Sequence, residues 1–167
     1  MQHLSKFKDC SNLQSLVLAE NMRATQDLKT RHNDIFLELI EWLGKCNQLR
    51  DITISNFVNA TDILTPFLQQ PGIKLETLEL EGYSLAESKD FHVALSLHKN
   101  LKSLYLKGED SEAVGDNDAF VESLSRLGNL KVRVGVSNIL QWSRGAFAGS
   151  QAAEALWRNA KISPCFV

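Results

Sequence analysis

The chain has 167 residues, 44% of them hydrophobic and 23% charged, with a formal net charge of -2 at pH 7. That length suits one domain with a sizeable core. The slight excess of acidic residues gives no surplus of positive charge, on which binding to nucleic-acid phosphates depends. Acidic residues interrupt even the most apolar stretch, 34-DIFLELIEWL-43, so no membrane span is expected.

A six-residue pattern, leucine-x-x-leucine-x-leucine, recurs along the chain. It appears as LQSLVL, LRDITI, LETLEL and LKSLYL, beginning at residues 13, 49, 75 and 101, so the starts are separated by 36, 26 and 26 residues. Each copy ends in an alternation of period two, which is typical of a strand with one buried face. We predict four strands whose leucines and isoleucines enter one core.

A helix is expected after each strand, because apolar residues at helical spacing follow a capping residue. The predicted N-caps are, in chain order, Asp34, Asp62 or Thr65, Ser88, and Asp116 or Asp118. Pro66 is then confined to a first turn, and Gly128 suits the end of the fourth helix.

The predicted unit of strand, loop and helix cannot cover its own apolar face, so neighbouring units must stack. A strand followed by a wider helix, repeated, forces curvature, with parallel strands on the concave side and helices on the convex side. The predicted fold class is therefore α/β, a solenoid of about four repeats over residues 1–136. Leu4 and Phe7 look like the tail of a preceding helix, so the chain is expected to open in the middle of a repeat.

The motifs LQSLVLAEN, LRDITI, LETLEL and LKSLYL resemble leucine-rich repeats of the ribonuclease-inhibitor-like kind, over roughly residues 4 to 130. The segments WLGKCNQLRDITISNF and KLETLELEGYSL are also similar to fungal repeat proteins, many of which are F-box-type substrate receptors of ubiquitin ligases. The resemblance implies substrate recognition, with a ligase adaptor reached only through a region absent from this chain.

The sequence departs from the regular family pattern in two places. The family's ladder asparagine occurs only as Asn21, and its counterparts are Phe57, Tyr83 and Glu109. We expect Phe57 and Tyr83 to pack inward. The first repeat also carries about ten extra residues, largely 22-MRATQDLKTRH-32, which read either as a disordered excursion or as a binding loop.

The carboxyl-terminal part changes character after Leu130. The stretch 130-LKVRVGVSN-138 still alternates and predicts a strand that leaves Lys131 and Arg133 outward. Residues 137–167 lose the period, and a short helix can follow Ser150. This segment is read as an irregular cap over the last open face, or alternatively as an independent partner-binding helix, through Trp142, Phe147, Leu156 and Trp157.

The cysteines and histidines favour packing over catalysis or metal binding. Cys10, Cys46 and His98 each lie three residues before the first leucine of a motif, which predicts a structural column at the helix-to-strand turn. Three cysteines are an odd number and no leader segment precedes them, so a reducing compartment, cytoplasmic or nuclear, is expected.

No cofactor or metal is expected either. The stretch 110-DSEAVGDND-118 resembles a calcium loop, but Val121 stands where the bidentate glutamate is needed. Glu79 and Glu81 lie on one strand face rather than opposite each other across a cleft, as glycosidase carboxylates do. We therefore predict that the protein is not an enzyme.

The outward strand positions form the candidate binding surface. If the strands stack in register, these positions line up in rows across the sheet. The predicted partner-binding residues are Asp51, Thr53, Ser55, Thr77, Glu79, Glu81, Ser103, Tyr105, Lys107, Lys131 and Arg133. Because the rows grade from small and apolar through acidic to basic, they suit a protein or peptide partner, with Tyr105 as an anchor. The alternative is a merely solvated face with self-satisfied ion pairs.

The functional expectation is a non-enzymatic protein-interaction module. Its most specific form is substrate recognition in a fungal F-box-type ubiquitin ligase component, as the resemblance implies. A rival is the sensor or scaffold region of an innate-immunity-like receptor, which shares the fold. A second rival, an enzyme or enzyme activator, has only Glu79 with Tyr105 as a candidate site.

Overall fold

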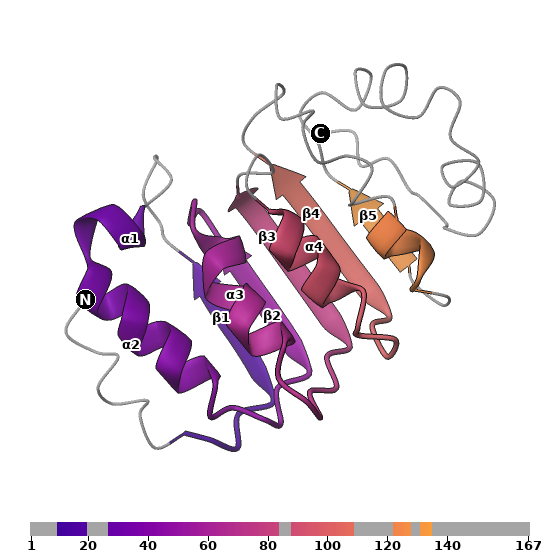
Figure 1. Cartoon of the computed structure of the whole chain (residues 1–167), viewed down its shortest axis with the longest axis horizontal. Coiled ribbons are helices and arrows are strands. Elements are labelled where there is room, and N and C mark those ends of the chain that lie inside the picture. The colour runs from indigo at the N-terminus through magenta and orange to yellow at the C-terminus, as the bar shows by residue number, and fades with distance from the viewer. Residues whose placement is uncertain (1–9, 20–26, 84–87, 109–121, 128–130, 135–167) are drawn as a thin grey trace.

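The structure is a computed structural model that describes residues 10–19, 27–83, 88–108, 122–127 and 131–134. A helical turn spans residues 122–125. The other elements are, in order, β1 (Ser15–Ala19), α1 (Leu28–Arg31), α2 (Asn33–Leu43), β2 (Asp51–Ser55), α3 (Ala60–Leu68), β3 (Thr77–Tyr83), α4 (Lys89–Leu95), β4 (Ser103–Gly108) and β5 (Lys131–Val134) (Figure 1). The protein is thus an α/β protein.

The strands form one parallel sheet in the order β1-β2-β3-β4-β5, so neighbours in sequence are neighbours in space. The register aligns the second apolar residue of every motif, in the row Leu16, Ile52, Leu78, Leu104 and Val132. The predicted parallel pairing of residues 75–80 with residues 101–106 is therefore confirmed where the strands run, from Thr77 and Ser103 onward.

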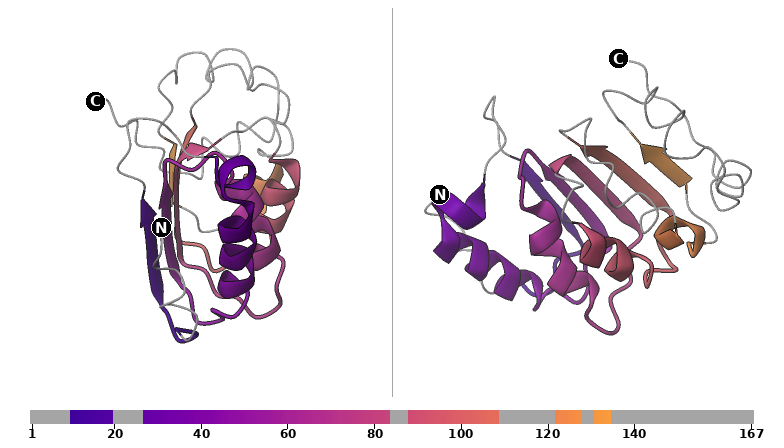
Figure 2. Two further views of the ribbon diagram at one scale, coloured as in Figure 1. Left: turned by 90° about the vertical axis from the view of Figure 1, so that its left-hand side faces the viewer. Right: turned by 45° about the horizontal axis from the view of Figure 1, so that its top comes forward.

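The helices lie on one face of the sheet. Figure 2 shows the strands in one layer and the helices in a second layer beside it. Each helix returns the chain from the carboxyl end of one strand to the amino end of the next, as a parallel connection requires.

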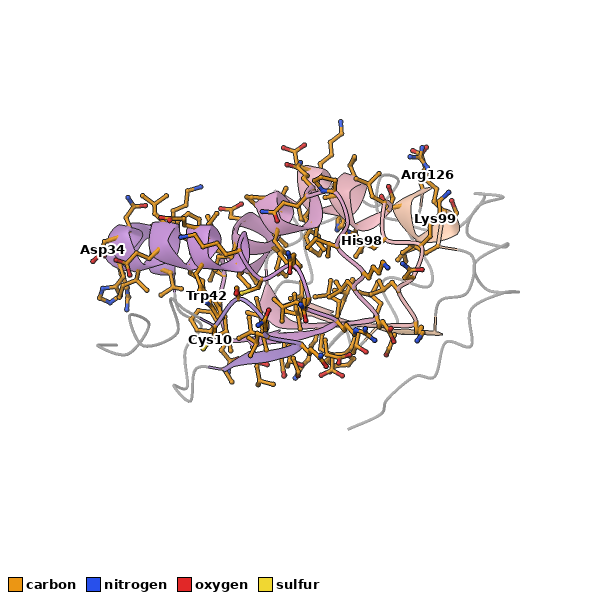
Figure 3. All side chains as sticks on the ribbon, turned by 90° about the horizontal axis from the view of Figure 1, so that it is seen from below. Cys10, Asp34, Trp42, His98, Lys99 and Arg126 are labelled. Atoms are coloured by element: carbon orange, nitrogen blue, oxygen red, sulfur yellow. The ribbon has the colours of Figure 1, made fainter. Side chains whose placement is uncertain are left out.

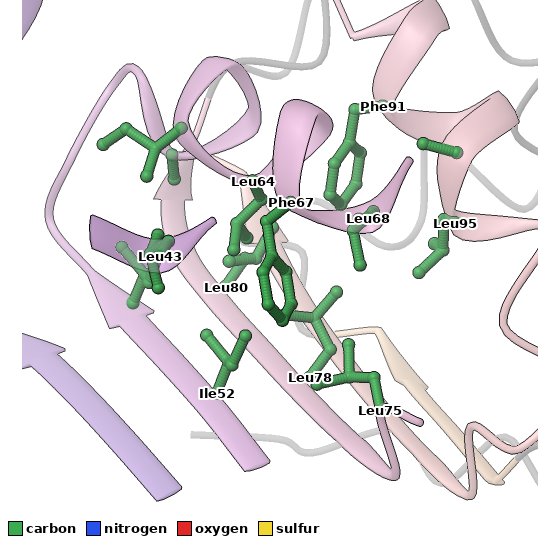
Figure 4. Close-up of a cluster of buried hydrophobic side chains, with 14 of the residues drawn as sticks. Leu43, Ile52, Leu64, Phe67, Leu68, Leu75, Leu78, Leu80, Phe91 and Leu95 are labelled. Carbon is green, nitrogen blue, oxygen red and sulfur yellow. The ribbon is translucent and has the colours of Figure 1, made fainter. Parts of the chain in front are cut away.

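The core lies between the two layers. The inward strand residues Ile52, Ile54, Leu78, Leu80 and Leu104 are fully buried. Apolar residues of the helices pack over them, as the close-up in Figure 4 shows for Leu43, Leu64, Phe67, Phe91 and Leu95. Phe57 is also buried, as predicted, whereas the Tyr83 side chain lies outside the described part of the structure. The leucines of the motif therefore contribute to one continuous core.

Two predicted helix starts are wrong. Asp34 is not an N-cap, because α2 begins at Asn33 and Asp34 lies in its first turn. In α3 the N-cap is Asn59 rather than Asp62 or Thr65, so Pro66 lies near the end of the helix. The burial of Ala60 and Thr61 explains the early start of α3, because packing against the core outweighs the local capping preference. The prediction that a helix follows Ser88 is confirmed.

The end of the inserted segment is helical, which corrects its interpretation as a disordered excursion for residues 27–32. Asp27 caps α1 by accepting a hydrogen bond from the Thr30 backbone N–H at 3.0 Å, and Leu28 is buried. Hydrogen bonds from Thr30 lower the pKa of the Asp27 carboxyl. Lys29 then reaches the next unit, where its N–H donates to Asn59 Oδ1 at 3.2 Å and its Nζ lies 3.1 Å from Asp62. This part of the insertion is fastened to α3.

The prediction of a structural column at the helix-to-strand turn is confirmed for Cys46 and His98, which are buried, but not for Cys10, whose side chain is exposed. The thiol of Cys46 is buried and donates to the backbone oxygens of Trp42 and Cys10, at 3.4 and 3.6 Å. His98 Nε2 lies 2.8 Å from the Leu68 carbonyl oxygen, which can only accept, so this nitrogen carries the proton. Burial raises the pKa of the Cys46 thiol. Cys46 and His98 thus each connect their own helix-to-strand turn to the preceding unit of strand and helix.

Several predictions fall outside the described residues. They concern Asn21, Glu109, the 110–118 loop, the N-cap of the fourth helix, the opening residues 1–9 and the capping segment 137–167. In the described part of the chain, no helix combines the length and the apolar character that crossing a membrane requires.

Candidate protein-binding surface

The candidate surface is the face of the sheet that the helices do not cover, here called the outer strand face. Its residues are the outward positions of β1 to β5, in the three rows predicted from the sequence. The register gives these rows as Ser15, Asp51, Thr77, Ser103 and Lys131; Val17, Thr53, Glu79, Tyr105 and Arg133; and Ala19, Ser55, Glu81 and Lys107. For Lys131 and Arg133 the structure describes only the backbone position.

Alternation along each strand produces this face. In β2 the residues Ile52 and Ile54 point into the core, so Asp51, Thr53 and Ser55 must point away from it. Figure 3 shows side chains extending from the sheet on the side opposite the helices. The sequence therefore brings together side chains that are far apart along the chain.

Two contacts link neighbouring strands across this face. Thr53 Oγ1 donates a hydrogen bond to Glu79 Oε2 at 3.2 Å. The Lys107 ammonium hydrogen-bonds to and forms an ion pair with Glu81, and both side chains remain about two-fifths exposed. That hydrogen bond raises the pKa of Lys107, although partial burial opposes the rise. The charged groups are thus positioned by their neighbours and still open to solvent.

The face changes in character from one edge to the other. At the β1 edge Val17 is 65% exposed, an apolar residue with no charged neighbour in its own row until Glu79. The middle carries Glu79 and Glu81, and the β4 side carries Tyr105 and Lys107, each partly exposed. Apolar, acidic, aromatic and basic groups therefore follow one another across four strands.

The two acidic side chains of β3 on this face are each bonded to a neighbouring strand. Glu79 and Glu81 lie two residues apart on one strand and bond to Thr53 and Lys107 respectively, so they do not oppose each other across a cleft. Among the described residues no group of three or more His, Cys, Asp or Glu side chains could hold a metal ion. The arrangement can donate and accept hydrogen bonds and present an aromatic ring over a broad surface.

Reasoning from the sequence missed a second charged cluster, at the amino-terminal edge of the sheet. Glu76 lies 2.5 Å from Lys102 Nζ and 3.7 Å from Arg50 Nη1. The signal was present, because these residues directly follow the first leucine of successive motifs. Only the in-register stacking of the strands shows that this shared motif position brings the three side chains into contact.

Comparison of the chain with protein-family models, curated proteins and solved structures finds no match.

Proposed function

We propose that this chain is a segment of a leucine-rich-repeat solenoid that binds a protein or peptide partner through the outer strand face. The motifs LQSLVL, LRDITI, LETLEL and LKSLYL and their parallel stacking support the repeat assignment. In this proposal the sheet lines the concave side of a curved stack, and residues 137–167 cap its end.

The observation that carries the proposal is the alignment of chemically different side chains on a rigid sheet. The Glu81–Lys107 pair and Tyr105 lie on adjacent strands in fixed register. Binding a partner here costs little conformational entropy of the sheet, because the hydrogen bonds between strands already fix the backbone positions that carry these side chains. Tyrosine beside charged groups is a common anchor of protein interfaces.

The narrower proposal is substrate recognition in a fungal F-box-type ubiquitin ligase component. It is supported by the resemblance of WLGKCNQLRDITISNF and KLETLELEGYSL to such repeat proteins. Under this proposal the protein is not an enzyme itself and works in the cytoplasm or nucleus. Affinity purification of the full-length gene product followed by mass spectrometry should recover a ligase adaptor subunit, and recovery of other partners without an adaptor would contradict this narrower form.

The broader proposal is tested by removing the two most distinctive side chains of the face. Tyr105→Ala combined with Lys107→Ala should leave the circular dichroism melt unchanged, because both residues are partly exposed. Capture of partners identified with the wild-type chain should fall by about tenfold or more, the effect of losing an interface anchor.

The matched control lies on α4, where Lys89 and Val93 are exposed on the helix layer. Lys89→Ala combined with Val93→Ala removes one cation and one exposed apolar group, and it should leave capture unchanged. Equal capture by the two double variants would overturn the assignment of binding to the outer strand face.

A further inference from the structure

A second surface lies where the strands begin, at the amino-terminal edge of the sheet. The residue after the first leucine of each motif occupies this edge, in the series Gln14, Arg50, Glu76 and Lys102. The backbone there is held tightly. The carbonyl oxygens of Gln14, Arg50 and Glu76 each accept two N–H groups from the next unit, at 2.7 to 3.1 Å. The charged side chains of this edge therefore project from a rigid frame.

The lysines of two helix-to-strand turns join this edge and enclose a depression. It is open to solvent, has a volume of about 610 Å³, and is lined by Arg50, Lys74, Glu76, Lys99, Asn100, Leu101 and Lys102. Lys99 directly follows His98, whose ring is bonded to the preceding unit, so the turn that carries this lysine is anchored (Figure 3).

The lining has an excess of positive charge. Four of its residues are cationic and one, Glu76, is acidic, although the whole chain has a formal net charge of -2. The hydrogen bond from Lys102 lowers the pKa of Glu76, with help from the charges of Lys102 and Arg50, so this carboxylate is ionised at neutral pH. It is already shared between those two cations.

The remaining two cations, Lys74 and Lys99, form no ion pair with any residue that the structure describes. No carboxylate of a described residue lies within 4.0 Å of the ammonium group of Lys74 or Lys99. Both lysines are exposed. They therefore add two positive charges to the lining of the depression, which also includes Asn100, whose side chain carries both a donor and an acceptor.

We propose that this depression, the basic edge site, binds an acidic peptide segment of a partner protein. Every second side chain of an extended peptide points to the same side, about 6.6 Å apart, so a run of acidic residues presents several carboxylates to the cationic lining of the depression. Nucleic acid fits less well, because none of the lining residues is aromatic and Glu76 repels phosphate. The proposal does not depend on the outer strand face, since none of its predicted residues lines the depression.

The test uses a fluorescein-labelled oligoglutamate peptide of about six residues, which spans about 20 Å when extended. Fluorescence anisotropy with the full chain should show saturable binding that weakens as salt is raised, since exposed charges are screened. Lys74→Gln combined with Lys99→Gln should weaken binding by about tenfold, as expected when two charge contacts are lost.

A matched control removes the same charge elsewhere. Arg31 and Lys89 are exposed and lie outside the depression, so Arg31→Gln combined with Lys89→Gln gives the same net charge and should keep wild-type affinity. Equal weakening in both double variants, or no saturable binding by the wild type, would overturn the proposal. Tighter binding of a single-stranded oligouridine of matched charge would contradict the choice of a peptide ligand.

Discussion

The two faces of the same sheet obey different rules. Toward the helices, the aliphatic residues Ile54, Leu80 and Leu106 lie side by side on the three central strands β2 to β4, and each is at most 1% exposed. One position earlier, on the opposite face, the row passes from Thr53 through Glu79 to Tyr105. Stacking fixes the residue type only where side chains enter the shared core. The outer strand face is therefore free to carry chemistry that the fold does not require.

The largest test of this contrast places the same charge on either face of β4. Leu104→Asp should unfold the chain, because an unpaired carboxylate would enter a fully buried position and cost more than about 4 kcal/mol. Ser103→Asp, one residue earlier on the outer face, should change the free energy of unfolding by less than about 1 kcal/mol. Urea denaturation followed by circular dichroism measures both. A native-like melt for Leu104→Asp would refute the assignment of this strand's faces.

A smaller effect is expected from acid, and it arises on the buried side. Burial lowers the pKa of His98 below its usual value of 6.5, even though the bond to the Leu68 carbonyl opposes the shift. Between pH 6.5 and the lower pKa that His98 has in the folded protein, the unfolded chain binds more protons than the folded one. The free energy of unfolding therefore falls as the pH falls through this range.

The change His98→Gln provides the comparison for this acid effect. Glutamine can still donate a hydrogen bond to the Leu68 carbonyl but does not titrate, so the variant should lose less stability between pH 7 and pH 5. Urea melts of both proteins across this range measure the difference. Identical pH profiles would show that His98 is not the source of the loss.

The smallest effect is expected on the outer strand face. A double-mutant cycle with Glu81→Gln and Lys107→Met should give a coupling energy of about 0–1 kcal/mol, because both side chains are partly exposed and screened by solvent. Chemical denaturation of the four proteins gives this value. A coupling above about 2 kcal/mol would mean that this face contributes to stability as the core does, and the contrast between the faces would fail.

The sequence was sufficient to predict the strands, their order and their register, because the positions of Leu16, Ile52, Leu78 and Leu104 in the motif leave one alignment that buries them all. The outer rows followed from the same alignment. These predictions rest on periodicity, which survives when individual residues vary.

Helix boundaries and contacts between distant side chains were less predictable. Asp62 looks like a cap, yet α3 starts before it because Ala60 and Thr61 are buried. No nearby sequence feature indicates that Lys29 lies beside Asp62. Arg50, Glu76 and Lys102 share a position in the motif, but their ion pairs become evident only when the strands are aligned. Such contacts depend on how the turns are placed after stacking, which no single stretch of sequence encodes.

The anchoring of α1 has a consequence for how the first two units come apart. Its Lys29 backbone N–H donates to the side chain of Asn59, the N-cap residue of α3, and its ammonium group reaches Asp62 in the first turn of that helix. A helix that belongs to the first unit by sequence thus connects that unit to the start of the helix in the second unit. Amide protons at the start of α3 should then exchange with solvent in step with those of α1, so that local opening spreads across the boundary between the two units instead of stopping at it.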